Sequence, residues 1–379
     1  MKVNRKFLRS AERLSLSAIA KDSAAQKIVS AVTAIGFVMQ PVAALASTIT
    51  RENGTAVTFN NNGVADIFAS QVVNNNVAIN KFKDFQLDAN NIANMYFSTS
   101  KDSNSAGNLV NFVNSRIDIN GTVNAIQNEK IGGNLFFFSS DGMAVGKTGV
   151  INAGALYVAT PTKTAFDDYK KLDTNDKFNT IIKDEGFAKI PINASGTISV
   201  LGKVNAVNAV NLRAAKIGVG KNVSGEAFDS VAAGATATGA SIRTGVVDFK
   251  DIVNIGKVKS DLTGNALKAT KDGSGDIVLA ASNNYNDNYS MLDDFSKIAG
   301  AKVEAELSVA NGAEVKATGN AKLSAQALNN VVVEKSDQYK ENYTPSTTTN
   351  SHLYGQIVTT NATVNPRAAR PLLPWPTAR

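Results

Sequence analysis

Few segments of this 379-residue sequence carry residue types that could support phosphate chemistry. Residues 142–148, Gly-Met-Ala-Val-Gly-Lys-Thr, resemble the end of a phosphate-binding loop. The first glycine of that motif would fall on Asp141. Residues 149–154 predict a strand and a turn, whereas a phosphate-binding loop needs a helix whose N-terminus holds the phosphate. We therefore expect no nucleotide site and no cofactor.

The titratable side chains do not suggest a catalytic set. His352 is the only histidine and lies in a Thr- and Asn-rich segment, where we expect no Ser/His/Asp triad. The absence of cysteine removes thiolate metal sites and cysteine nucleophiles. The acidic pairs fit solvated helix faces, and they are Asp167/Asp168, Asp184/Glu185 and Asp293/Asp294. We expect no catalytic residue and no metal site, but carboxylates gathered in a groove would instead indicate a β-helix polysaccharide lyase or glycosidase.

The net charge of +7 is concentrated at the two ends of the chain. Residues 1–46 hold seven Lys/Arg and two Asp/Glu, and residues 366–379 hold three Arg. Residues 47–365 hold 29 Lys/Arg and 30 Asp/Glu. A nearly neutral body lacks the basic surface that nucleic-acid-binding proteins present to phosphates, so we expect no nucleic-acid partner.

Residues 1–46 have the pattern of an extended signal peptide. A long basic region precedes an apolar stretch at residues 28–39, and an Ala-Leu-Ala pattern then predicts cleavage between Ala46 and Ser47. A retained membrane anchor is the alternative. Its apolar part would be shorter than the roughly 20 residues that span a bilayer, and Pro41 interrupts the segment.

The body of the chain, residues 47–337, consists of short apolar bursts separated by Asn/Gly turns, as in 115–125, 148–158 and 196–206. Asn and Gly tolerate the left-handed backbone of sharp corners, and β-branched residues favour strands. The loose recurrence predicts an all-β fold, a right-handed parallel β-helix (solenoid) in which each coil buries its apolar face against its neighbours. A β-sandwich is the second interpretation, although it would need clearer hairpin spacing.

Two stretches interrupt this pattern and predict small helical excursions. Residues 161–189 are charged and carry regularly placed apolar residues, and residues 290–299 begin with a capping-box pattern at Ser290 and Asp293. Residues 338–379 are rich in Thr, Asn and Pro. We expect a disordered linker or tail there.

Residues 134–160 combine an apolar strand, a tight turn, a second apolar strand and an Ile-Asn-x-Gly-x-Leu motif. This segment resembles the two-partner secretion, or haemagglutination-activity, domain of filamentous-haemagglutinin-like and leukotoxin-like adhesins. The matching positions are Gly142, Gly146, Ile151, Asn152, Gly154 and Leu156, whereas Ser139, Ser140 and Asp141 stand where the family has Asn-Pro-Asn. Asp-Gly can form the same tight corner as Asn-Gly. Upstream, Asn108 and Asn111 resemble an earlier Asn-rich turn of the family.

The resemblance implies a secreted, adhesin-like exoprotein module without enzymatic activity. It implies recognition by an outer-membrane pore-forming transporter, folding at the bacterial cell surface, and attachment to host-cell surface glycans or proteins. We expect the export function in residues 76–160, and in the corner 139–142 in particular. Gly142 should adopt a backbone conformation closed to residues with a Cβ, and the phenylalanines at 136–138 should alternate between two environments.

Overall fold

The fold is all-β, as the sequence predicts. The computed structural model describes residues 47–249, 267–290, 303–336, 339–343, 347–359 and 361–366. Strands make up 50% and helices 8% of the structure. All of the described residues belong to the unit that begins at Ser47.

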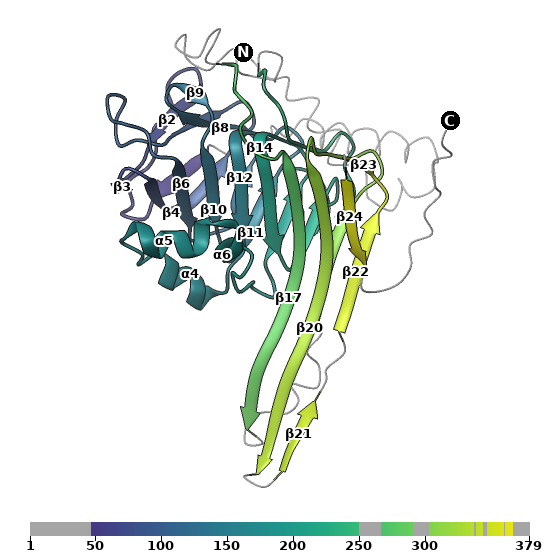
Figure 1. Ribbon diagram of the computed structural model, residues 1–379. Helices are drawn as coiled ribbons and strands as arrows, with labels where there is room; N and C mark the ends of the chain where they lie inside the picture. The colour runs from purple at the N-terminus through teal and green to yellow at the C-terminus, as the bar shows by residue number, and fades with distance from the viewer. Residues whose placement is uncertain are drawn as a thin grey trace, which may run out of the picture. The chain divides into compact units, whose positions relative to one another are not determined.

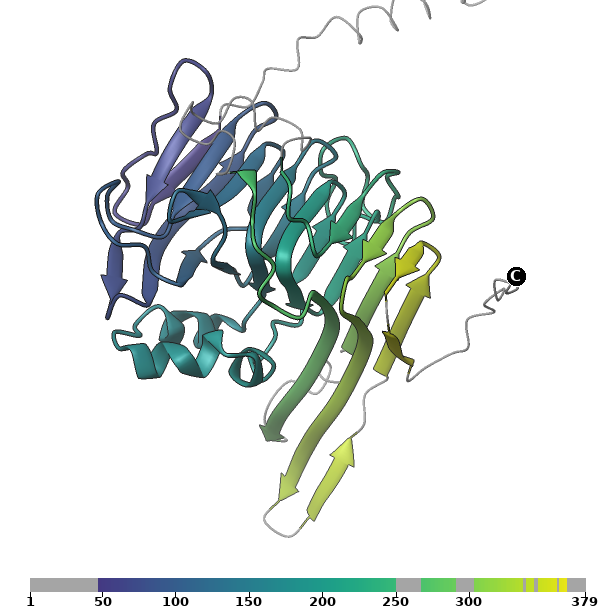
Figure 2. The same ribbon diagram turned by 45° about the horizontal axis from the view of Figure 1, so that its top comes forward.

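Three parallel ladders, here named A, B and C, account for most of the strands (Figures 1 and 2). Ladder A contains β4 (Val77–Leu87), β6 (Asn108–Val113), β10 (Asn134–Phe138), β12 (Val150–Ala159), β14 (Lys203–Ala214), β17 (Asp276–Ser290), β20 (Asn320–Ser336) and β24 (Asn361–Pro366). Ladder B contains the end of β4, then β7 (Ile117–Ile119), β11 (Gly142–Val145), β13 (Thr197–Val200), β15 (Lys216–Val219), β18 (Val303–Val309) and β22 (Thr347–Leu353). Ladder C contains β2 (Val64–Phe68), β5 (Ile92–Tyr96), β8 (Thr122–Gln127), the first parts of β12 and β14, β16 (Ser241–Arg243), β19 (Glu314–Lys316) and β23 (Gln356–Val358).

The chain visits the ladders in a fixed order, A then B then C, before it returns to A. The strands β6, β7 and β8 make one such circuit, and β10, β11 and the first part of β12 make the next. Consecutive circuits stay in register, because Leu109 pairs with Leu135 and Leu135 pairs with Leu156. Similar residues therefore stack on one another from circuit to circuit.

One buried apolar cluster joins the inner sides of all three ladders. Leu156 on ladder A, Ile198 on ladder B and Ile151 on ladder C belong to it, and each is at most 1% exposed. Side chains alternate along a strand, so the residues between these positions point away from the cluster. Burial of each large apolar side chain contributes about 1.5–3 kcal/mol, and this shared core stabilises the stack of circuits.

Short antiparallel strands are added to the parallel ladders. β1 (Thr48–Arg51) and β3 (Gln71–Val73) both pair with β4 at the N-terminal end of the sheet. β9 (Lys130–Ile131) pairs with β8, and β21 (Tyr339–Tyr343) pairs with β20. β1 and β3 thus cover strand edges that the first circuit would otherwise leave open.

The helices lie within residues 161–189, as predicted. They are α4 (Lys163–Tyr169), α5 (Asn175–Ile182) and α6 (Asp184–Phe187). Threonine side chains at the N-caps accept hydrogen bonds from the backbone, Thr162 in α4 and Thr174 in α5. The helices cover the outer side of ladder A in Figure 1. Among the described residues, no helix is long and apolar enough to cross a bilayer.

The C-terminal part differs from the irregular linker or tail expected for residues 338–379. Residues 347–366 contain β22, β23 and β24, which extend ladders B, C and A by one strand each. Threonine, valine and isoleucine favour strands, and an open ladder edge supplies hydrogen-bonding partners that composition alone does not reveal. The helix expected at residues 290–299 lies outside the described residues, apart from Ser290, which ends β17.

Candidate functional site

The predicted corner at residues 139–142 connects β10 of ladder A with β11 of ladder B. The amide of Gly142 donates to the carbonyl of Ser139 at 3.3 Å and closes a four-residue turn. Gly142 has φ of +100°, which residues with a Cβ rarely adopt. A Cβ added to Gly142 would lie 2.0 Å from the carbonyl oxygen of Thr197 in β13. The prediction that this corner requires glycine is confirmed.

The two serines of the corner are fixed inside the fold. Ser139 is 1% and Ser140 is 6% exposed. The Ser139 hydroxyl donates to the carbonyl of Ser115 at 2.7 Å, and the Asn193 amide donates to the carbonyl of Ser140 at 2.9 Å. Asp141, in contrast, is exposed. It is the side chain of this corner that a partner could contact.

Asp141 lines a polar depression of about 440 Å³ together with Arg116. Arg116 Nε lies 2.7 Å from one Asp118 oxygen, and its Nη2 donates to the other at 3.1 Å. This hydrogen bond raises the pKa of Arg116, and the charges of Glu226 and Asp141 act in the same direction. Arg116 thus pairs with Asp118 and, at 3.5 Å, with the exposed Glu226, whereas Asp141 is the acid within the corner itself.

The two other glycines of the resemblance allow close packing between circuits. A Cβ on Gly146 would lie 1.8 Å from Asn120 Oδ1, and a Cβ on Gly154 would lie 2.6 Å from the backbone nitrogen of Gly133. Neither glycine is available to a partner, since their surroundings leave no room even for a methyl group. They are packing positions of the fold.

Asn152 belongs to a stack of side chains on ladder C, in which the asparagines are buried. The stack runs Asp66, Asn94, Asn124, Asn152 and Asn205, and every member pairs in register with the next. Each asparagine Nδ2 donates to the side-chain oxygen of the preceding member, at distances between 2.9 and 3.1 Å. Because it donates to Asn124 in one neighbouring circuit and accepts from Asn205 in the other, Asn152 holds these circuits together.

Asn108 and Asn111 occupy two similar stacks on ladder A. The first consists of Asn76, Asn108 and Asn134, and the second of Asn80 and Asn111. Asn111 is fully buried and also donates to the carbonyl of Phe136 at 3.0 Å. The upstream turn residues are therefore structural as well.

The three phenylalanines of β10 face two environments, as predicted. Phe137 belongs to the interior cluster, whereas Phe136 and Phe138 pack with the helices. Phe187 of α6 has its ring centroid 6.2 Å from that of Phe136 and 6.1 Å from that of Phe138. The helices thus cover aromatic side chains that would otherwise be exposed on ladder A.

Of the two residues that flank the predicted cleavage bond, Ser47 is described and Ala46 lies outside the described residues. The Ser47 hydroxyl accepts hydrogen bonds from the amide of Asp88 at 2.8 Å and from Asn91 Nδ2 at 2.7 Å. These two hydrogen bonds hold Ser47 against the loop between β4 and β5.

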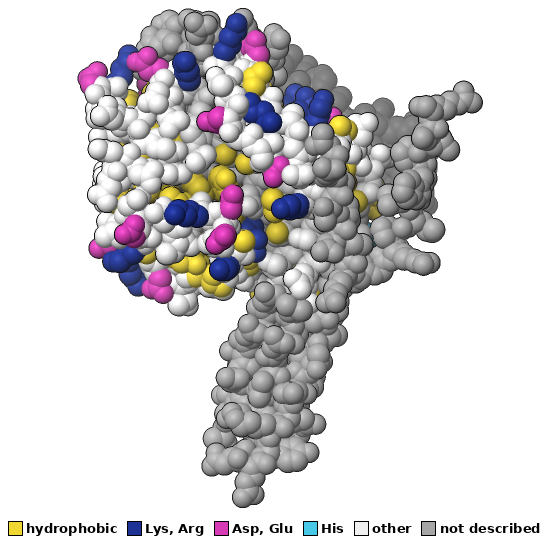
Figure 3. All heavy atoms as spheres, in the orientation of Figure 1, with side chains coloured by type: hydrophobic (Ala, Val, Ile, Leu, Met, Phe, Trp, Pro, Cys, Tyr) yellow, Lys and Arg dark blue, Asp and Glu magenta, His cyan; other side chains and the backbone are white. Residues whose placement is uncertain are grey.

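A groove of about 790 Å³ runs across the outer side of ladder A, between α6 and the loop that precedes β17. Figure 3 shows hydrophobic, basic and acidic side chains side by side on this face. Tyr157, Asn211, Arg213 and Lys322 line the groove together with three carboxylates, those of Asp184, Asp272 and Asp276. Burial, together with the adjacent Asp184, raises the pKa of Tyr157, so its hydroxyl stays protonated.

The sequence alone did not indicate this groove. Asn211 and Arg213 alternate with the interior residues Val210 and Leu212, so the pattern of β14 indicates that the two polar side chains point outward. Which residues of other circuits lie beside them depends on the register, which the sequence alone does not provide.

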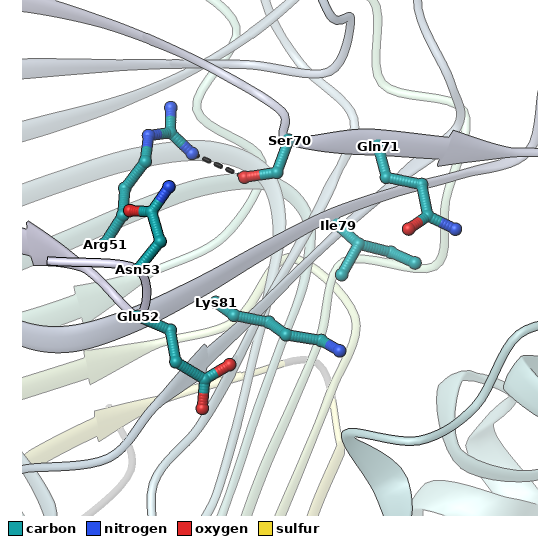
Figure 4. Close-up of a pocket in the computed structure, with 7 residues that line it drawn as sticks. All are labelled: Arg51, Glu52, Asn53, Ser70, Gln71, Ile79 and Lys81. Carbon is teal, nitrogen blue, oxygen red and sulfur yellow. Dashed lines mark hydrogen bonds between the residues drawn. The ribbon is translucent and has the colours of Figure 1, made fainter. Parts of the chain in front are cut away.

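A second cavity, of about 380 Å³, lies between the β1 end and β3–β4 (Figure 4). Arg51 points toward Ser70 and donates to its hydroxyl at 2.5 Å, to Asn80 Oδ1 at 3.0 Å and to the carbonyl of Phe68 at 2.8 Å. Burial lowers the pKa of Arg51. Three acceptors within the fold thus hold the guanidinium group of Arg51 in place.

The phosphate-loop-like segment has no phosphate-binding geometry. Lys147 Nζ donates to the Ser230 hydroxyl at 3.2 Å, and Thr148 Oγ1 donates to the carbonyl of Asn120 at 2.7 Å. β12, rather than a helix, follows this segment.

The remaining titratable candidates are dispersed. His352 lies on β22 and stacks on Tyr354, with 5.9 Å between the ring centroids. Asp167 pairs with Lys163 on the surface of α4. Within the described part of the chain, no three His, Cys, Asp or Glu side chains gather as a metal site would require.

Two comparisons of this sequence with known proteins found no match. A scan against protein-family models matches no family, and a search of curated proteins finds no match. Function is therefore inferred from the residues and their places in the fold.

Proposed function

We propose that this chain is a secreted, haemagglutinin-like exoprotein module that an outer-membrane two-partner secretion transporter recognises, and that it serves in surface attachment. In this proposal the three ladders form a right-handed parallel β-helix with a helical excursion over ladder A. The observation that carries the proposal is the corner at 139–142. It combines a glycine-only turn with one exposed acidic side chain, inside the segment that resembles the secretion family.

The positions of the other matching residues support the proposal. At Gly146 and Gly154 the stacked circuits approach so closely that a Cβ would overlap with a neighbouring circuit. At Asn152 the circuits exchange buried hydrogen bonds. A repeating coil needs small residues and self-pairing amides at such positions. The motif is therefore consistent with the physical needs of a stacked fold, and Asp141 is left as the residue free to serve recognition.

Two features of the sequence support export in an unfolded state. The first is the signal-peptide pattern, which predicts cleavage between Ala46 and Ser47. The chain also has no cysteine, so no disulfide could form in an oxidising periplasm and block passage through a pore. N-terminal sequencing of exported protein should begin at Ser47, and an intact Met1 terminus would reject the processing step.

A β-helix polysaccharide lyase or glycosidase is the second candidate, and the groove on ladder A is the observation that favours it. Its carboxylates, however, already accept hydrogen bonds: Asp272 from Asn208 at 2.5 Å and Asp276 from Asn320. Paired catalytic carboxylates need a free acid or base facing the scissile bond. Release of reducing ends or unsaturated products from polysaccharides would establish the enzyme, and no release would favour the binding module.

The export proposal is tested in a strain that carries the cognate transporter. Deletion of residues 76–160 should abolish secretion, and unchanged secretion would refute the assignment. Asp141→Ala should lower secretion without changing folded stability, because its side chain is exposed and makes no described hydrogen bond. Asp176→Ala is the matched control, since Asp176 is also an exposed acid but lies outside residues 76–160. Equal secretion of both variants would leave the corner with a structural role only.

A further inference from the structure

The groove on ladder A is built from two rows of outward-facing side chains on neighbouring strands. The pairing places Tyr157, Asn211, Val278 and Lys322 side by side on β12, β14, β17 and β20. A second row contains Asn134, Ala155, Ala209 and Asp276. With adjacent strands about 4.8 Å apart, four positions span about 14 Å. The groove therefore presents side chains from four successive strands in register, polar ones among small or apolar ones, rather than one isolated pocket.

Polar atoms on its floor lack partners. Asn211 is only 8% exposed, and its Oδ1 has no hydrogen bond within the described structure. Arg213 Nε is likewise buried without an acceptor. Burial removes water from the charged guanidinium group of Arg213 and thereby lowers its pKa. Buried unsatisfied polar groups cost free energy, and a bound ligand that supplies their hydrogen bonds would remove that cost.

The charges of the groove specify the class of ligand. Two cations, Arg213 and Lys322, stand against the three carboxylates of Asp184, Asp272 and Asp276, so the lining is nearly balanced. Such a lining gives no net attraction to a polyanion such as a nucleic acid or a sulfated polymer. It offers both donors and acceptors, which suits groups that both donate and accept, as hydroxyls do.

The shape of the groove agrees with a chain-like ligand. The small residues Ala155 and Ala209 leave the floor of the second row open between the larger side chains. The ring of Tyr157 is held in place by stacking on Phe136, with 4.5 Å between the centroids. An elongated ligand with several hydroxyl groups could thus contact both rows at once.

We propose that this groove binds an uncharged oligosaccharide, whose hydroxyl groups hydrogen-bond to Asn211, Arg213 and the neighbouring carboxylates. This inference deepens the surface-attachment part of the proposed function and rests on it. It assigns attachment to the outer side of ladder A, away from the corner at 139–142. Binding is measured on purified protein without export, so failure of this inference and failure of the export proposal are distinguishable.

The test uses the purified full chain on immobilised hexose and N-acetylhexosamine oligosaccharides of at least three sugars, followed by calorimetric titration at low and high salt. We expect binding whose affinity does not change with salt. Asn211→Ala and Arg213→Lys should each weaken it about tenfold or more, because a lost hydrogen bond of this kind is worth about one decade in affinity. Arg243→Ala, which removes an exposed ion pair with Glu314 on ladder C, is the control and should bind like the unmodified protein.

Three outcomes would overturn the proposal. Binding to none of the uncharged oligosaccharides would reject the ligand class. Salt-sensitive binding only to uronic-acid or sulfated oligosaccharides would replace it with an anionic ligand. Unchanged affinity in a folded Arg213→Lys variant would place the ligand elsewhere, and this conservative change remains informative if Asn211→Ala fails to fold.

Discussion

Replacement of Gly142 by alanine should destabilise the corner through two effects at once. The first is the backbone conformation, since Gly142 has φ of +100°. The second is the overlap of the new Cβ with the Thr197 carbonyl, a backbone atom that cannot move without disturbing β13. The left-handed region costs a residue with a Cβ about 1–2 kcal/mol. Overpacking of a filled site adds about 1–3 kcal/mol.

Two other glycines serve as comparators. Gly54 has φ of +85° but open space around the position of a Cβ, so Gly54→Ala should show only the backbone cost of about 1–2 kcal/mol. Gly225 has open space and no positive φ, so Gly225→Ala should be neutral or stabilise the fold by up to about 1 kcal/mol. Gly142→Ala should lose about 2–5 kcal/mol, the sum of both effects.

Urea unfolding followed by circular dichroism measures these differences as shifts in the midpoint at constant slope. The expected order of stability is Gly225→Ala, then Gly54→Ala, then Gly142→Ala. If Gly142→Ala were no less stable than Gly54→Ala, the neighbouring strand would have moved aside, and the corner would not be the rigid feature described above.

Three further predictions concern the stacks, the groove and the helices. Asn152→Leu should cost about 2–4 kcal/mol, because it leaves a buried acceptor on Asn124 and a buried donor on Asn205 unpaired; a loss below 1 kcal/mol in urea unfolding would contradict this. Above about pH 10 the free energy of unfolding should fall as pH rises, because the unfolded chain releases the Tyr157 proton while the folded protein, with its raised pKa, keeps it. Tyr157→Phe should therefore make that pH dependence shallower by at most about 1.4 kcal/mol per pH unit, and an unchanged slope would show that Tyr157 titrates normally. Phe138→Ala should destabilise by about 3–5 kcal/mol in thermal or urea unfolding, unless the helices can collapse onto the cavity.

The sequence predicted those features that depend on local chemistry. Short apolar bursts such as 148–158 indicated strands, and the charged stretch 161–189 indicated helices. The need for glycine at position 142 followed from the tight turn that an Asp-Gly pair forms. Each of these features is decided within about ten residues of chain, where composition and turn preference are informative.

Features that depend on register could not be predicted in the same way. Asn152 was singled out because it matches a family motif, yet its position in a stack depends on Asn124 and Asn205 in other circuits. The groove around Arg213 depends on the same long-range pairing. The strands at 347–366 form on ladder edges created by earlier circuits, so a Thr-rich composition alone suggested an irregular segment.

The asparagine stack has a consequence for the order in which circuits assemble. Asn124 donates to Asn94 of the preceding circuit and accepts from Asn152 of the following one, so each circuit completes the buried hydrogen bonds of its predecessor. A partly assembled stack would end on an amide that faces water until the next circuit pairs with it and buries it. β1 and β3 cover the free edge of β4, so ladder A can be extended only at its other end. Circuits can therefore add in order from the N-terminus toward the C-terminus, which is the order that a chain emerging gradually from a pore would require.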